Sequence, residues 1–177
     1  RQMKSQDMFQ NAYGDETFYL TTDEAVNFAD TTKYIWKGGT KTILINVALS
    51  DATDIRLPEA TTDNAGLQVK VVFALAPAEN VNIGFVTTNI VGGWVGTSDG
   101  TEGVAASFMG FSVVGDGYKR VELDKDGEVA KAGGEAGTIL EFFYTGVANV
   151  AIYRGHLIAD VDSATGTTHA VTTTIIA

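Results

Sequence analysis

Short runs of alternating apolar and polar residues dominate the chain from Thr17 onward. The run at residues 67–75 alternates in its first half and becomes wholly apolar in its second. Alternation with a period of two is typical of a strand that buries one face, and a continuous apolar run is typical of a strand buried on both faces. We therefore expect residues 67–75 to form a central strand of a sheet.

Similar short runs recur along the chain, separated by Gly-, Asp-, Asn- and Pro-containing turns. Pro58 should end the run at 54–60 or place it at a sheet edge, because proline offers no N–H to the strand ladder. Residues 33–37 and 41–49 flank Gly38 and Gly39 and favour a hairpin or a bent strand, whereas residues 23–28 suit one helical turn or a loop. The other predicted strands cover residues 16–21, 81–86, 90–95, 107–114, 119–123, 128–130, 138–144, 147–153, 156–161 and 170–176.

The pattern predicts an all-β fold. No segment has an apolar stripe of helical period longer than about three turns. About ten short strands in close succession favour a single antiparallel domain, built as a β-sandwich, a jelly roll or a small barrel. A sequence repeat of about 20–50 residues is not evident, which disfavours a solenoid. We expect the C-terminal strand to pair within its own sheet.

The first residues differ from the rest. Residues 1–16 are polar and follow neither a strand nor a helix period, which predicts an N-terminal arm preceding a globular domain at residues 17–177. The arm is either a frayed terminus or a tether to a neighbouring subunit. In the second case, its interface anchors would be Met3, Met8, Phe9 and Tyr13. No apolar run suits a secretory leader or a membrane span.

Composition narrows the possible chemistry. The 177 residues include 22 acidic and 12 basic side chains, giving a formal charge of −10, with two histidines and no cysteine. Disulfides, thiolate zinc sites and multi-histidine metal sites are therefore excluded. The acidic balance argues against nucleic acid or an anionic membrane as the main partner. We expect no cofactor and no metal.

No motif indicates an enzyme. The segment 124–128 resembles the opening of a calcium loop, but the spacing is incomplete and a hairpin turn is the simpler interpretation. The carboxylate pairs Glu122/Asp124 and Asp160/Asp162 suit a solvated strand face. A G-x-S-x-G elbow is absent from the sequence. Trp36 and Trp94 are expected to be core residues or interface anchors.

Two segments resemble a pattern found in small virion proteins of tailed bacteriophages. The first contains an I-x-L-P-x-A strand at residues 55–60 and, after the turn at Gly66, a V-x-F strand at residues 71–73. The second, residues 138–146 with 150–153, is similar to the closing hairpin of such proteins. The tryptophan that often follows the glycine there is absent from residues 147–150.

The resemblance implies a β-rich capsid decoration (cement) protein, typically a homotrimer seated over contacts between major capsid protein subunits, with no catalytic residues. Trp36, Trp94 and the arm would then supply interface contacts. The −10 charge favours the outer capsid surface, since it would repel packaged DNA. A receptor- or glycan-binding tail-fibre or adhesin domain is the alternative from a different class, and a small hydrolase is the third.

Overall fold

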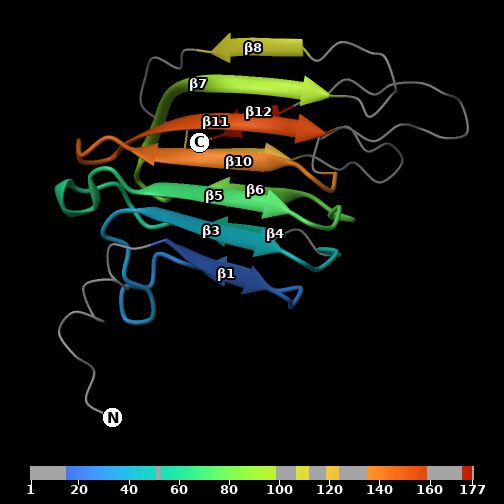
Figure 1. Ribbon diagram of the computed structural model, residues 1–177, viewed down its shortest axis with the longest axis horizontal. Coiled ribbons are helices and arrows are strands. Elements are labelled where there is room, and N and C mark those ends of the chain that lie inside the picture. Colours follow the sequence, from blue (N-terminus) through green and yellow to red (C-terminus); the bar gives the residue numbers. More distant parts are fainter. Residues whose placement is uncertain are drawn as a thin grey trace, which may run out of the picture.

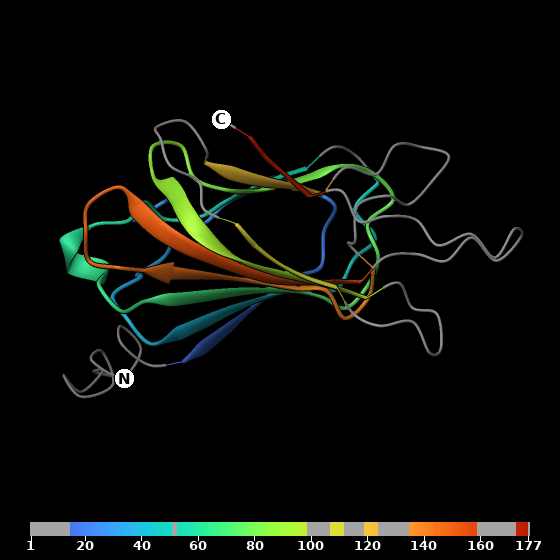
Figure 2. The ribbon, with the colours of Figure 1, turned by 90° about the horizontal axis from the view of Figure 1, so that it is seen from above.

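Two β-sheets packed face to face form the body of the protein, as the computed structural model shows (Figures 1 and 2). The structure describes residues 15–50, 53–98, 107–111, 119–123, 135–158 and 173–176. Within this part of the chain, no helix is long and apolar enough to cross a membrane. The larger sheet faces the viewer in Figure 1, and the smaller sheet lies behind it.

The larger sheet has seven strands and the smaller sheet five. In spatial order, the larger sheet consists of β1 (Glu16–Leu20), β3 (Thr40–Ile45), β5 (Gln68–Phe73), β10 (Ile139–Tyr144), β11 (Val150–Ile158), β7 (Asn89–Ser98) and β8 (Ser107–Phe111). The smaller sheet consists of β12 (Thr173–Ile176), β9 (Arg120–Leu123), β6 (Val81–Gly84), β4 (Thr53–Arg56) and β2 (Val26–Asn27). The 3₁₀ helix η1 (Thr62–Asn64) follows β4.

The first six strands alternate between the two sheets, so the chain winds as a flattened coil. Strands β1, β3 and β5 are parallel neighbours in one sheet, and β2, β4 and β6 are parallel neighbours in the other. Thr40 pairs with Gln68 and Thr53 with Val81, which is an offset of 28 residues in both sheets. The offset is 25 residues between β1 and β3 and 29 residues between β2 and β4. The coil repeats its apolar alternation and not its residues, so it leaves no repeat in the sequence.

The all-β prediction is confirmed, but the sheets are mixed and not antiparallel. A coil brings the chain back to the same sheet in the same direction, which makes the early neighbours parallel. Antiparallel pairs come later in the chain, where β10 joins β5 to β11 and β9 joins β6 to β12. In the described residues both sheets have two separate edge strands, so neither closes into a barrel.

Several predicted strands are confirmed. β5 lies inside the larger sheet, between β3 and β10. β4 ends at Arg56, ahead of Pro58, and β12 pairs with β9 of its own chain. The segment at 23–28 contains only the two-residue strand β2, and the strands predicted at 147–153 and 156–161 merge into β11. Gly155 lies within this long strand, and a Cβ there would lie 2.2 Å from the Tyr153 hydroxyl oxygen. The absence of a side chain at residue 155 therefore leaves room for the Tyr153 ring.

The strand predicted at residues 33–37 is wrong. The backbone turns at Asp30, whose carbonyl accepts hydrogen bonds from Lys33 and Tyr34, and no strand follows before β3. The apolar residues of this segment instead supply an aromatic cluster, in which the Trp36 ring stacks on Phe18 at 5.3 Å. The residues of an aromatic cluster need not alternate, but over a short run their spacing can match that of a strand. Alternation over residues 33–37 therefore could not distinguish a cluster from a strand.

One hydrophobic core fills the space between the sheets. Ile43 and Val71 of the larger sheet meet Ile55, Ile83 and Val121 of the smaller one, and all five are fully buried. Full burial of each such side chain contributes about 1.5–3 kcal/mol relative to exposure. The core therefore fixes which face of each sheet points outward.

Candidate functional site

The two outward sheet faces differ in chemistry. The smaller sheet carries polar and charged side chains at the positions that alternate with its core residues: Asp54, Asn82 and Glu122, with Arg56 and Arg120. Both arginines reach Asp54, at 3.0 Å from Arg56 and 3.8 Å from Arg120. These side chains are half-buried and partly ion-paired, so this face is polar and charged.

The outward face of the larger sheet carries a row of apolar side chains. In strand register, Tyr19 of β1 pairs with Leu44 of β3, Leu44 with Val72 of β5, and Val72 with Ile139 of β10. Tyr19 is 67% exposed and Ile139 37%, while Leu44 and Val72 are half-buried. We call these four residues the apolar row. Exposed apolar residues aligned in this way are typical of a protein-interaction surface.

A charged group lies beside the apolar row on the same face. Glu141 of β10 sits between Lys70 of β5 and Arg154 of β11, in direct register with both. Its carboxylate accepts hydrogen bonds from Lys70 Nζ at 3.1 Å, from Gln68 Nε2 at 3.1 Å and from the Arg154 guanidinium. The guanidinium carbon also lies 5.2 Å from the centre of the Phe143 ring.

Lys70 and Arg154 compensate the charge of Glu141 within the face, and the group of three keeps one net positive charge. Glu141 is only 8% exposed, so its negative charge depends on Lys70 and Arg154 for compensation. A partner surface could cover this group without leaving a buried, unpaired charge, which is the main cost of burying ions. The apolar row and the paired charges together form what we call the docking face, in view in Figure 1.

Glu59 is a second concentrated polar feature, at the end of the molecule near η1. Its carboxylate accepts backbone N–H groups of Val86, Thr87 and Thr88 at 2.7–3.2 Å and the hydroxyls of Thr87 and Thr88 at 2.8 and 2.6 Å. Burial opposes ionisation of Glu59, but these hydrogen bonds outweigh it and hold the pKa of the carboxyl below its usual value of 4.5.

The Glu59 site is structural. Its carboxylate is occupied by donors of the β6–β7 loop, so it has little capacity to act as a base. Nearby, the Tyr144 hydroxyl donates to the Pro58 carbonyl at 2.8 Å. Burial, with the Glu59 charge as a smaller cause, raises the pKa of Tyr144 well above its usual value. Within the described residues, no group of three or more His, Asp or Glu side chains is placed to hold a metal ion.

The structure describes two of the six residues predicted as interface anchors, Trp36 and Trp94. Trp36 is 7% exposed and packs in the aromatic cluster with Phe18 and Phe28. Trp94 lies in β7, in register with Arg154 of β11 and Gly110 of β8. The other four predicted anchors lie outside the described residues: Met3, Met8, Phe9 and Tyr13. The segment 124–128 and the pair Asp160/Asp162 also lie outside them.

The docking face was missed by the sequence analysis, although a signal for it exists. Val72 stands within an unbroken apolar run, and Ile139 and Phe143 flank Glu141 in β10. Such runs were interpreted as burial on both faces. On the outward face of the described strands, Val72 is half-buried and Ile139 is 37% exposed, so the same signal indicated an apolar surface on that face.

Comparisons of the chain with protein-family models, with curated proteins and with solved structures find no match.

Proposed function

We propose that the chain is a non-enzymatic structural protein of a tailed-phage virion, a capsid decoration (cement) protein that binds the outer head surface through its docking face. The single observation that carries the proposal is the difference between the two outward faces: one is polar and charged, and the other has the apolar row beside ion pairs formed within the face. A protein that coats a particle needs one face for the particle and one for the solvent.

The proposed body is a β-sandwich of jelly-roll-like type, assembled as a homotrimer over the major capsid protein. The facing sheets and their single core support the sandwich, and the resemblance to small virion proteins supports the trimer. A trimer multiplies weak contacts through effective concentration. Binding to the assembled lattice and not to its dissociated subunits stabilises the lattice by mass action.

The state of the acidic side chains supports a role without catalysis. Glu59 and Glu141 are each held by hydrogen bonds or ion pairs from three described residues, and both serve internal structure. A catalytic acid or base instead needs a lone pair or proton free to reach a substrate.

Cryo-electron microscopy of particles that contain the protein tests the proposal. Copies distributed over the icosahedral shell, with the docking face against the major capsid protein, are expected. Density confined to the tail would overturn it and favour a receptor- or glycan-binding domain.

A pair of variants tests the face itself. Ile139→Lys places a charge in the apolar row and should reduce occupancy on heads at least tenfold, because an unpaired lysine would be buried on binding. Val86→Lys is the matched control, since Val86 is 53% exposed and lies in the β6–β7 loop. Equal occupancy of the two variants would exclude the docking face.

A further inference from the structure

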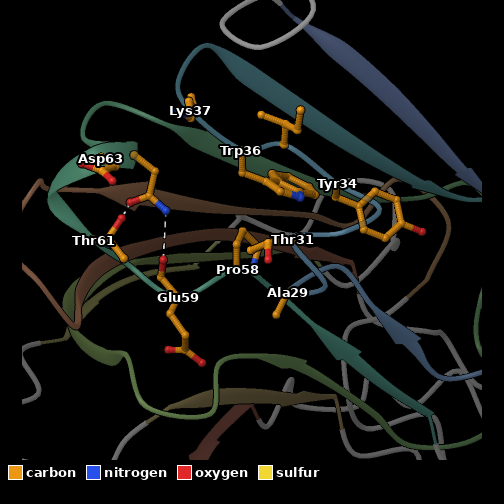
Figure 3. A pocket seen from close by; sticks show the side chains of 11 residues that line it. Ala29, Thr31, Tyr34, Trp36, Lys37, Pro58, Glu59, Thr61 and Asp63 are labelled. Atoms are coloured by element: carbon orange, nitrogen blue, oxygen red, sulfur yellow. Dashed lines mark hydrogen bonds between the residues drawn. The ribbon is translucent and has the colours of Figure 1, made fainter.

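A pocket lies at the end of the molecule near η1. It encloses about 480 Å³ between the loop after β2 and the segment from Pro58 to η1 (Figure 3). This volume falls within the range of small-molecule sites. Trp36, Tyr34 and Pro58 provide apolar walls, and we call it the Trp36 pocket.

Trp36 carries an unsatisfied donor in this wall. Its side chain is more than nine-tenths buried, and its indole Nε1 has no hydrogen-bond partner in the described structure. Figure 3 shows the nitrogen on the ring edge facing Thr31 and Tyr34, which also line the pocket. A buried N–H without an acceptor is costly, so an acceptor atom brought by a ligand would be stabilising.

The other polar groups of the wall divide into engaged and available ones. Asn64 donates to the Glu59 carbonyl at 2.9 Å and accepts from the Thr61 N–H at 2.8 Å. The Glu59 carboxylate is directed away from Trp36, toward the β6–β7 loop (Figure 3). Exposed at the rim are the hydroxyl of Thr31 and one charge of each sign, Lys37 and Asp63.

From this arrangement we propose that the Trp36 pocket binds a single neutral sugar ring. A sugar ring has apolar C–H faces that suit aromatic and proline walls, and hydroxyl oxygens that can accept from the Trp36 N–H. The opposite charges of Lys37 and Asp63 give no preference for an anion or a cation, and both can hydrogen-bond hydroxyl groups. Because Nε1 is buried, binding requires the side chains that cover it to move. This activity is additional to capsid binding and does not depend on it.

The indole N–H signal of Trp36 in a ¹H–¹⁵N correlation spectrum reports the contact directly. The chain has two tryptophans, so Trp94→Phe identifies the Trp36 signal. The probes are glucose, galactose, mannose, N-acetylglucosamine, rhamnose and ribose, each up to about 50 mM. At least one is expected to move the Trp36 indole proton downfield saturably, with a Kd on the order of 1 mM. If no sugar moves it more than it moves the Trp94 signal, the proposal is wrong.

A pocket-filling variant separates binding in the pocket from a general solvent effect. Ala29→Leu adds bulk to the pocket wall and should weaken the response at least tenfold. Ala48→Leu makes the same change at an exposed position and should leave the response unchanged. Thermal unfolding of both variants verifies that they are folded. An undiminished response in folded Ala29→Leu would overturn the assignment to this pocket.

Discussion

Glu59 illustrates how much one side chain can organise, since it fixes three consecutive residues of the β6–β7 loop. Its folded pKa lies below the ordinary value of 4.5, so its contribution to folding is complete above about pH 4.5 and is lost as the pH falls through the folded pKa. Glu59→Gln should lower the free energy of unfolding at pH 7 by about 2 kcal/mol. The free energy of unfolding of this variant should also fall less steeply as the pH is lowered. Denaturant unfolding between pH 7 and pH 3 measures both effects.

Glu79→Gln is the control for this change, because Glu79 is exposed. It should unfold as the unmodified protein does across the same pH range. An equal loss of unfolding free energy in both variants at pH 7 would show that the β6–β7 loop does not depend on Glu59.

Two glycines with positive φ allow the free-energy cost of backbone strain to be compared with the cost of a steric clash at an added Cβ. At Gly66, φ is +79° and a Cβ would meet nothing within 4 Å, so Gly66→Ala should cost only the left-handed backbone, about 1 kcal/mol. At Gly84, φ is +155° and a Cβ would lie 2.3 Å from the Lys119 carbonyl oxygen. Lys119 directly precedes β9, the strand that pairs with β6. Gly84→Ala should therefore cost at least about 2 kcal/mol more. Calorimetry that gave equal costs would contradict the close approach of β6 and β9.

At the scale of elements, the coil makes Ile55 and Ile83 equivalent. They pair in register between β4 and β6, and both are fully buried. Ile55→Ala and Ile83→Ala should each destabilise the protein by about 2–5 kcal/mol, because each leaves a cavity in the same core. Exposed Val147→Ala serves as the control and should change stability by less than about 0.5 kcal/mol. A cost below about 1 kcal/mol for either isoleucine would contradict the shared core.

The existence of most strands could be predicted from the sequence, but their partners could not. Alternation in β5 and the proline after β4 are local signals, and both predictions hold. The direction of pairing is decided by where the chain returns, which local alternation does not encode. The prediction at residues 33–37 failed for a related reason: the Tyr34 and Trp36 rings pack in a cluster with Phe18 of β1 and with Phe28, which directly follows β2. Local alternation does not encode such packing.

The candidate sites were harder to predict than the strands. The Trp36 pocket joins two loops, and the docking face joins the five strands β1, β3, β5, β10 and β11, so both exist only after folding. Two of the predicted anchors, Trp36 and Trp94, were chosen for residue type alone. Residue type does not reveal whether an aromatic ring packs internally, as Trp36 does.

At the scale of the whole molecule, the proposed orientation on the capsid predicts a labelling pattern. Lys70 lies in the docking face, with 37% of its side chain exposed, whereas Lys119 precedes β9 of the opposite sheet. On decorated heads, a bulky amine-reactive reagent should label Lys119 and leave Lys70 protected, while the free protein should be labelled at both. Mass spectrometry of tryptic peptides measures the ratio, and equal labelling of Lys70 in both states would contradict the orientation.

The 28-residue offset between β3 and β5, and again between β4 and β6, has a consequence for the width of such a protein. A duplicated segment equivalent to residues 40–67 would add one strand to each sheet without altering any existing register. Each sheet would widen by about 4.8 Å, the spacing of neighbouring strands. The width of the surface offered to a partner is therefore adjustable in discrete steps by tandem duplication, while the chemistry at both ends of the molecule stays as it is.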